Sequence, residues 1–580
     1  MTLTGGDHVA DELVRQRVAA IFTLCGGHIS PILVSARARG VHIVDVRDEA
    51  TALFAADAVS RLGEVPGVAA VTAGPGVTNT ITALKNAQLA QSPVVLLGGA
   101  TATVLKGRGA LQDIDQASLV RPHVKWLASV SRVADLAPAL AHAFAEARAG
   151  VPGPVFVECP VDLLYPEALV REWYLGKGTG TSASLAERVE RWYLVRHLSK
   201  VFAGAGSVSA PSASGPSHDI RGLSRFVARA VARLARAERP VLVVGSQAVG
   251  HGATVLPLAS AIARLGIPTW LSGMARGLLG RDHAVQFRHK RREALREADL
   301  VILAGTPCDF RLEYGRHISR RAALIGVNRS AEDLVKNRRP QVGVVGPPDA
   351  FLRALADGGP PAPTRWAAWV EALRAREAAR DREIDVQAAV PASPVSPLLV
   401  CRAIDAALPD DSIVVADGGD FVATASYVVR PRRPLSWLDP GVFGTLGVGA
   451  GFALGAHASR PSAEIWAIYG DGAFGFSVSE IDSLVRHRVP VIAVIGNDGR
   501  WNQIARDQVT VLGDDVATEI GRADYHAVAE GFGARGLLLD RPDRVSAVFA
   551  EAREVARSGR PVIVNALIGD TDFRKGSLSI

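Results

Sequence analysis

Short apolar runs rich in β-branched residues alternate along the chain with longer segments rich in alanine, leucine and arginine. The clearest runs span residues 43–46, 68–72, 94–97, 155–157, 240–245, 300–305, 324–327, 412–417, 464–469 and 489–496. Runs that are apolar at nearly every position are typical of parallel strands, because helices cover both faces of a parallel sheet. The pattern therefore predicts an α/β protein built on parallel sheets.

The alternation falls into three blocks, and a chain of 580 residues is too long for one hydrophobic core. We expect three doubly wound parallel-sheet domains, over residues 1–165, 221–360 and 396–580. Glycine, serine and alanine gather at 176–181 and 204–215, which favours a linker or mobile segment over residues 166–220. A charged helical stretch followed by a proline-rich one favours a second linker over residues 361–395.

Composition narrows the range of partners. The 65 basic and 58 acidic residues give a net charge of +7 without one long basic run, which argues against nucleic acid and for anionic small molecules. The short basic cluster at 289–292 is interpreted as a solvated helix face. The four cysteines are far apart, which excludes a disulfide framework and fits a reducing compartment. No signal peptide or membrane-length apolar segment is visible, so we expect a cytoplasmic protein without a membrane partner.

The most specific motif is Gly470-Asp471-Gly472, which follows one apolar strand, while Asn497-Asp498 ends the next. Glycines let the backbone approach phosphate groups, and the N-terminus of the following helix supplies N–H donors. A carboxylate and a second oxygen ligand from the neighbouring strand end can hold a Mg²⁺ ion that bridges two phosphates. The motif therefore predicts a site for a diphosphate and a metal ion.

This motif resembles the fingerprint of the thiamine-diphosphate enzyme family. In that family the second side-chain ligand of Mg²⁺ usually lies 27 positions after the first aspartate, which here is Asp498. The family has asparagine at that position, so Asn497 stays open as a rival ligand. The resemblance implies that Asp471 is the first ligand and that Arg500 contributes its backbone carbonyl. It also places Gly470, Gly472 and Ala473 against the cofactor.

A glutamate in the first block extends the resemblance. Glu49 begins a helix after a strand, where the family uses a glutamate to hydrogen-bond the aminopyrimidine ring of the cofactor and to promote its activation. Such a carboxyl group is buried, and its environment controls its proton. By itself Glu49 would be a carboxylate at a helix N-terminus; beside the glycine–aspartate–glycine motif, the resemblance implies a catalytic role.

Further segments of the first and third blocks resemble the same family. The turn from Thr72 through Pro75 to Asn79 is similar to its glycine-rich cofactor turn. The resemblance places Gln112 near the reacting carbonyl, although a polar loop without a ligand is the alternative. His28 follows a glycine pair and is either a polar contact to substrate or a neighbour of a helix cap.

In the third block, Gly444 and Leu446 occupy the loop where the family places a bulky apolar residue between the two rings of the cofactor. Leu446 fits that position by its size, and by itself it would be one more core leucine. The family fold consists of pyrimidine-binding, central and diphosphate-binding domains. Its cofactor lies between the first domain of one subunit and the third domain of another, which implies a homodimer or homotetramer with active sites at the subunit interface.

Within the family, the chain is most similar to the acetolactate-synthase-like branch and especially to 2-hydroxyacyl-CoA lyases. The segments that carry this likeness are residues 437–441, 443–452, 472–477 and 571–577. The resemblance implies cleavage of a 2-hydroxyacyl-CoA, short or branched substrates such as 2-hydroxyisobutyryl-CoA included, to formyl-CoA and an aldehyde or ketone. Acetolactate synthase is the alternative, and a flavin-dependent pyruvate oxidase is a further one; a non-catalytic relative would have lost Glu49 or Asp471.

Further residues are candidates for contacts with the substrate and with a nucleotide. Coenzyme A needs cations for its phosphates, and the candidates are Arg430, Arg432, Arg433, Arg574 and Lys575, each of which alone would be a solvated cation. Glu480 is a candidate catalytic helper or a structural ion-pair partner. The family keeps ADP or FAD in the central domain, and the corresponding strand ends here carry Gly245, Ser246, Gly305, Arg311 and Asn328. A vacant pocket there is the alternative.

Overall fold

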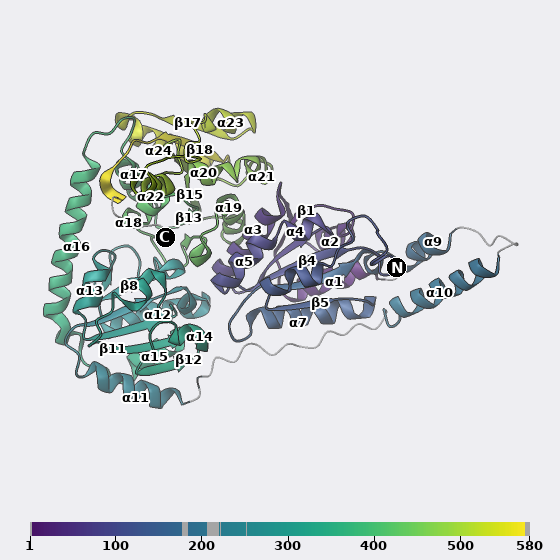
Figure 1. Ribbon diagram of the computed structural model, residues 1–580, viewed down its shortest axis with the longest axis horizontal. Helices are drawn as coiled ribbons and strands as arrows, with labels where there is room; N and C mark the ends of the chain where they lie inside the picture. Colours follow the sequence, from purple (N-terminus) through teal and green to yellow (C-terminus); the bar gives the residue numbers. More distant parts are fainter. Residues whose placement is uncertain (1–2, 177–183, 206–219, 221, 251, 575–580) are drawn as a thin grey trace. The chain divides into compact units, whose positions relative to one another are not determined.

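A computed structural model of the chain describes residues 3–176, 184–205, 220, 222–250 and 252–574 (Figure 1). Its strands form three six-stranded sheets in which every pairing of named strands is parallel, so the predicted α/β class is confirmed. The first sheet belongs to one compact unit, and the second and third sheets belong to another. No helix of the described part has an apolar stretch long enough to cross a membrane.

The first sheet has the strand order β2-β1-β3-β4-β6-β5. Its strands are β1 (Ala20–Leu24), β2 (His42–Asp45), β3 (Gly67–Val71), β4 (Val94–Ala100), β5 (Trp126–Ser129) and β6 (Val155–Pro160). Its helices are α1 (Gly5–Arg15), α2 (Ser30–Ala38), α3 (Glu49–Leu62), α4 (Pro75–Thr78), α5 (Ile81–Ala90), α6 (Gln116–Val120), α7 (Leu136–Arg148) and α8 (Val161–Leu164). β3, β4 and β6 are buried at every position, as expected for central strands with helices on both faces.

The second sheet has the order β12-β11-β10-β7-β8-β9. Its strands are β7 (Pro240–Val244), β8 (Thr269–Leu271), β9 (Gln286–Phe287), β10 (Leu300–Ala304), β11 (Ala323–Asn328) and β12 (Val342–Val345). Its helices are α11 (Leu223–Leu234), α12 (Gly252–Leu265), α13 (Arg291–Glu297), α14 (Ala331–Val335) and α15 (Pro348–Asp357). The long helix α16 (Ala367–Ala388) follows this domain.

The third sheet has the order β14-β13-β15-β16-β18-β17. Its strands are β13 (Ser412–Ala416), β14 (Trp437–Leu438), β15 (Glu464–Gly470), β16 (Val491–Asn497), β17 (Arg535–Leu539) and β18 (Val562–Leu567). Its helices are α17 (Pro397–Ala407), α18 (Asp420–Val428), α19 (Gly449–Ser459), α20 (Asp471–Gly475), α21 (Ile481–Arg486), α22 (Asn502–Leu512), α23 (Tyr525–Gly531) and α24 (Val545–Arg557).

Each sheet contains a pair of neighbouring strands from which the chain leads away in opposite directions: β1 and β3, β7 and β10, and β13 and β15. The turns at the carboxyl ends of two such strands diverge to opposite faces, which leaves a crevice where α/β proteins bind ligands. These three places therefore set where candidate sites lie.

Two helices of the first unit lie in the segment 166–220, which the sequence favoured as a linker. They are α9 (Glu167–Leu175) and α10 (Leu185–Val201), and Figure 1 draws them extending from the first sheet. Residues 177–183 and 206–219 of the expected mobile segment, and Lys575 at the chain end, lie outside the described residues.

Candidate cofactor site

In the third domain, the turns after β13 and β15 meet where the strand order changes direction. The N–H of Gly470 donates to the carbonyl oxygen of Gly418 at 2.9 Å, and a Cβ atom on Gly470 would lie 2.8 Å from that oxygen. Glycine therefore permits this approach. Asp471 follows at the start of α20, where its buried carboxylate accepts N–H groups from Gly472 and Gly499 at 2.8 and 2.6 Å.

Asp498, directly after β16, adds a second carboxylate to this site. Burial and the negative charge of Asp471 raise the pKa of Asp498 to about 7. Asn497 turns its Nδ2 to the carbonyl oxygen of Ala523 and to Oδ1 of Asn565, at 2.9 and 3.0 Å. The buried carboxylate of Asp471 and the partly buried carboxylate of Asp498 are the ligands that a hard divalent cation prefers, so the residues fit Mg²⁺. Asn497 stays a rival ligand, because its Oδ1 is buried and has no hydrogen-bond partner among the described residues.

The loop that carries Leu446 is held against this site by Asp417, a buried residue that the sequence did not single out. Its two carboxylate oxygens accept the N–H groups of Gly447 and Gly449 at 3.0 and 2.8 Å. A Cβ atom on Gly418 would lie 2.1 Å from Cδ2 of Leu446, so the leucine side chain lies directly on the turn after β13. The predicted apolar wedge is thus positioned beside the predicted diphosphate turn.

In the first domain, the structure brings together two of the predicted residues, Glu49 and Asn79. Glu49 begins α3 and is buried, and Asn79 Nδ2 donates to its Oε2 at 2.9 Å. The turn at Gly76 lies close by, since a Cβ atom there would be 3.5 Å from Oε1 of Glu49. A buried carboxyl group with a neutral amide partner can exchange a proton with a ligand ring without competition from a cation.

Thr72 and His28 lie where the turns after β1 and β3 meet. A Cβ atom on Gly26 would lie 2.4 Å from Cβ of Thr72, and His28 Nδ1 lies 3.2 Å from Thr72 Oγ1. Burial lowers the pKa of His28, which keeps the imidazole neutral near pH 7. Pro75 begins α4 directly after this turn.

A second glutamine, Gln116, fixes the turn that precedes Pro75. Its Oε1 accepts the N–H of Gly74 at 2.8 Å, and its Nε2 donates to the Gly99 carbonyl and to Glu158 at 3.0 Å each. Gln112 packs on the same turn, because a Cβ atom on Gly74 would lie 2.9 Å from Cβ of Gln112. The sequence pointed to Gln112 and missed Gln116, which carries no motif of its own.

Comparison with known proteins places this geometry in a family. The model "Thiamine pyrophosphate enzyme, N-terminal TPP binding domain" matches residues 3–119, the central-domain model of the same enzymes matches 227–355, and their C-terminal TPP binding domain matches 417–566. The chain belongs to the thiamine pyrophosphate enzyme family. Thiamine pyrophosphate is another name for thiamine diphosphate, so the cofactor expected from the sequence is confirmed.

Relatives are similar over nearly the whole chain. Human "2-hydroxyacyl-CoA lyase 2" is 50% identical, with 99% of this chain and 92% of the human protein covered. The zebrafish protein of the same name is 48% identical over 99% of this chain and 93% of its own. A "Probable acetolactate synthase" of Mycobacterium bovis is 34% identical over 98% and 96%. The predicted branch of the family is confirmed.

The roles of the other predicted family residues stay predictions. Gly444 has a positive φ of 65°, and Ala473 is buried within α20. The N–H of Arg500 donates to Asp498. Glu480 is fully buried and accepts the hydroxyl of Ser483 at 2.6 Å, so it can act only through buried neighbours.

In the central domain, the predicted nucleotide residues converge where β7 and β10 diverge. A Cβ atom on Gly245 would lie 2.5 Å from the carbonyl oxygen of Gly305. Ser246 Oγ accepts the N–H of Met274. Asn328 is buried, and its Nδ2 has no hydrogen-bond partner among the described residues. Arg311 is paired with its near neighbour Asp309 at 2.7 Å.

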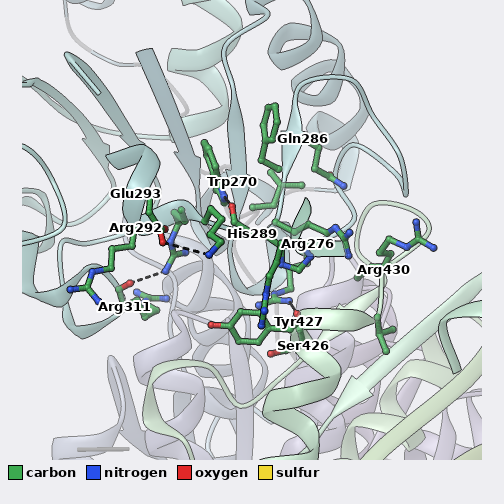
Figure 2. Close-up of a pocket in the computed structure, with 18 of the residues that line it drawn as sticks. Trp270, Arg276, Gln286, His289, Arg292, Glu293, Arg311, Ser426, Tyr427 and Arg430 are labelled. Carbon is green, nitrogen blue, oxygen red and sulfur yellow. Dashed lines mark hydrogen bonds and ion pairs between the residues drawn. The ribbon is translucent and has the colours of Figure 1, made fainter. Parts of the chain in front are cut away.

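A strongly basic pocket of about 750 Å³ lies beside these strand ends, between the second domain and the C-terminal end of α18 (Figure 2). Arginine and lysine dominate its lining, and Glu293 is the one carboxylate among the residues that line it. Figure 2 shows Arg276, His289 and Tyr427 gathered around the pocket. Its volume lies within the range of sites for cofactors and drug-sized ligands.

Several cations of this pocket have no carboxylate partner within the described chain. They are Arg276, Arg291 and Arg292. Arg276 donates to the carbonyl of Ser426 at 2.6 Å and stacks on Trp437, while its buried Nε is left without an acceptor. Burial lowers the pKa of Arg276 and Arg291, because desolvation penalises an uncompensated charge. The pocket therefore favours an anion.

The arginines that the sequence predicted for coenzyme A have other partners. Arg430 lines the pocket but is paired with Asp405 at 2.6 Å, and Arg432 is buried against the same carboxylate. Arg433 pairs with Asp411. Arg574 stacks on Tyr427, 5.6 Å from its ring centre. These pairings leave Arg432 no surface for a phosphate, because its side chain is only 1% exposed.

Proposed function

We propose that this chain is a thiamine-diphosphate-dependent lyase that cleaves a 2-hydroxyacyl-CoA to formyl-CoA and an aldehyde or ketone. Its relatives named 2-hydroxyacyl-CoA lyase 2 support this reaction, and the acetolactate synthase relatives are more distant. The observation that carries the proposal is the cationic pocket beside α18, because 2-oxo acids have no phosphate groups for it to bind. In this reaction the bond between the carbinol and thioester carbons breaks. The carbinol hydroxyl loses its proton as the new carbonyl forms, and the thioester carbon gains a proton to give formyl-CoA.

The coenzyme A portion of the substrate fits this pocket. Arg276, Arg291 and Arg292 offer unpaired charges for the phosphates of coenzyme A. Phe310 and Tyr427 are about half exposed and offer flat rings on which an adenine can stack. α18 runs from the turn after β13 to this pocket, and its nine residues span about 14 Å at ~1.5 Å per residue. The pantetheine arm would bridge that distance to the reacting end.

Each protein residue has a distinct proposed task at the reacting end. Asp471 and Asp498 would hold Mg²⁺ beside the diphosphate, and Leu446 would contact the rings of the cofactor. Glu49 would hydrogen-bond the aminopyrimidine ring and exchange a proton with it, and the burial of Glu49 would limit competition from water. Bound thiamine diphosphate supplies the electron sink for breaking the bond between the thioester and carbinol carbons.

The proposal also covers the binding of the acyl portion of the substrate and of a nucleotide in the central domain. His28 and Gln112 would bind the hydroxyl and carbonyl oxygens, and short or branched substrates such as 2-hydroxyisobutyryl-CoA are the first candidates. An ADP or FAD molecule at Gly245 and Asn328 stays a prediction. The feature that supports it is the buried Nδ2 of Asn328, which has no hydrogen-bond partner among the described residues. We further propose a homodimer or homotetramer with active sites shared between subunits.

A substrate panel tests the reaction. The purified chain, supplied with thiamine diphosphate and Mg²⁺, is offered 2-hydroxyacyl-CoAs of different length and branching, and separately pyruvate. We expect formyl-CoA and a carbonyl product in equal amounts from at least one CoA ester. Acetolactate from pyruvate, with no CoA ester cleaved, would show that the alternative reaction is the right one.

Variants of the pocket test how the substrate is held. Arg276→Gln combined with Arg291→Gln should raise KM for the CoA ester by about tenfold or more with a smaller change in kcat, as the loss of uniform binding does. Arg433→Gln is the matched control, because it removes an arginine that is paired with Asp411 outside the pocket. Equal KM values for the double variant and the control would remove the pocket from substrate binding.

A further inference from the structure

Helix α10 in the first unit has two opposite apolar sides. At 3.6 residues per turn, positions 194, 198 and 201 share one side. Leu198 and Val201 are buried on it, and Val201 joins the hydrophobic core of the first domain. His197 anchors the same end of the helix, since its Nε2 lies 2.7 Å from Thr103 Oγ1. One apolar side thus attaches α10 to its own domain.

The opposite side of α10 is exposed. Positions 185, 189, 192, 193, 196 and 200 share this outward side, and they are occupied by Leu185, Val189, Trp192, Tyr193, Arg196 and Lys200. The exposed fractions of the leucine and the tryptophan are 76% and 62%. Single exposed apolar residues are ordinary, whereas four on one helix side form a patch that needs a partner.

Charge is divided between the two sides. The acidic residues of α10, Glu187 and Glu190, lie on the attached side, and Glu187 belongs to the capping box at the start of the helix. The outward side carries only cations among its charged residues, Arg196 and Lys200, and Arg188 flanks it. The guanidinium of Arg196 lies 5.7 Å from the ring centre of Trp192, so cation and aromatic are next to each other.

We propose that the outward side of α10, defined by residues 185, 189, 192, 193, 196 and 200, binds an anionic lipid surface. Tryptophan and tyrosine prefer the interface between water and acyl chains, and arginine and lysine attract anionic headgroups. This is a peripheral contact, which differs from the sequence-based expectation that the chain has no membrane partner. It holds α10, and with it the first domain, at a lipid surface.

The same side of α10 in a second copy of the chain is a poorer occupant. Two copies of α10 that met through it would place Arg196 and Lys200 opposite leucine, valine and other cations, with no acidic residue of that side to pair with them. Like charges at an apolar contact disfavour association. An anionic surface satisfies the apolar and the cationic residues together.

Vesicle sedimentation tests the proposal on the full-length chain. We expect the protein to sediment with phosphatidylcholine vesicles that contain about one third phosphatidylglycerol, and to stay in solution with phosphatidylcholine alone. Added salt should weaken the association. Val189→Ser combined with Trp192→Ser should lower the partition coefficient about tenfold or more, because both side chains lose apolar area at the interface.

Control variants distinguish lipid binding by α10 from a general effect of positive charge and from an effect on catalysis. Arg196→Gln with Lys200→Gln should weaken binding, whereas Arg316→Gln with Arg541→Gln, at exposed positions of the other unit, should not. All variants should keep wild-type turnover of soluble substrate. Vesicle binding is measured without substrate, so its outcome does not depend on whether the proposed reaction is the right one. Absence of sedimentation with anionic vesicles, equal binding by the serine variant, or a larger molar mass for wild type than for that variant in solution would overturn the proposal.

Discussion

Glu49 is buried, and Asn79 Nδ2 donates a hydrogen bond to its side chain at 2.9 Å. Glu49→Gln keeps the shape of the side chain and removes its acid–base function, so we expect turnover to fall by at least about a hundredfold while the fold is retained. Steady-state kinetics and a thermal melt measure the two effects. Asp48→Asn is the control, because Asp48 is an exposed carboxylate one position earlier. Near-normal turnover of Glu49→Gln would exclude Glu49 from catalysis.

The choice between Asp498 and Asn497 as metal ligand can be decided by variants. Asp471→Ala and Asp498→Ala should each weaken Mg²⁺ and thiamine diphosphate together, because the metal bridges protein and diphosphate. Asn497→Ala removes the hydrogen bonds to Ala523 and Asn565 and should lower stability by about 1–3 kcal/mol with little loss of metal affinity. Calorimetric titration and denaturant unfolding measure these quantities. Loss of Mg²⁺ in the Asn497 variant alone would reverse the assignment.

Site residues that belong to a local sequence motif could be predicted. Residues that hydrogen-bond backbone groups far away in the sequence could not. Asp471 and Glu49 stand beside strand ends in recognisable patterns. Asp417 and Gln116 accept N–H groups from glycines 30 or more positions away, so no local pattern reveals them. Arg432 misled the sequence prediction for the opposite reason, because an arginine that pairs with a buried carboxylate looks like a solvated one in sequence.

At the scale of elements, the loop from Gly447 to Gly449 depends on the carboxylate of Asp417. Each oxygen accepts one backbone N–H, and an amide offers only one oxygen, so Asp417→Asn leaves one N–H without an acceptor. We expect a loss of about 1–3 kcal/mol in unfolding free energy and weaker thiamine diphosphate binding, because Leu446 lies on that loop. Ser412→Ala, at the start of the same strand, is the control for a change in β13 alone. Unchanged cofactor affinity would separate Asp417 from the loop's function.

The same variant has a predicted pH dependence. Burial raises the pKa of Asp417 to about 7, from an ordinary value of 3.8, so the folded chain holds a proton that the unfolded chain releases above pH 4. The stability that this proton contributes is complete below pH 4 and is lost as the pH rises to 7. Wild type should lose unfolding free energy between pH 5 and pH 7, and Asp417→Asn should make this decline shallower. The part that comes from Asp498, whose pKa is also raised to about 7, should remain. Parallel slopes in the two proteins would contradict the raised pKa.

Strands that are buried on both faces were predicted well, whereas a helix with apolar residues on two opposite sides was not. The central strands are apolar at nearly every position, which is why their places in the sequence were clear. α10 has apolar residues on both sides and charges between them, so it lacks the single stripe that identifies an amphipathic helix. The helices α9 and α10 were therefore taken for linker. The basic cluster at 289–292 was interpreted as a solvated helix face, but in the structure it lines the pocket beside α18 together with cations from other elements.

At the scale of the whole molecule, the three sheets share one structural feature. In each, the change of direction in strand order brings two glycine-containing turns together: Gly26 with Thr72, Gly245 with Gly305, and Gly418 with Gly470. The first and third carry the predicted cofactor residues, and the second carries the predicted nucleotide residues. A repeated fold thus provides three similar crevices whose side chains differ in task.

The proposed sharing of active sites between subunits predicts that two inactive variants can restore each other. If Glu49 of one subunit works with Asp471 of its partner, a mixed dimer of Glu49→Gln and Asp471→Ala chains contains one site with both native residues and one site with neither. Equal amounts of the two variants, unfolded and refolded together, should therefore regain about a quarter of wild-type turnover, since half of the dimers are mixed and half of their sites are intact. Each variant refolded alone is the control and should stay inactive. If instead both residues of a site belonged to the same chain, every site in the mixture would lack one of them, and no activity would return.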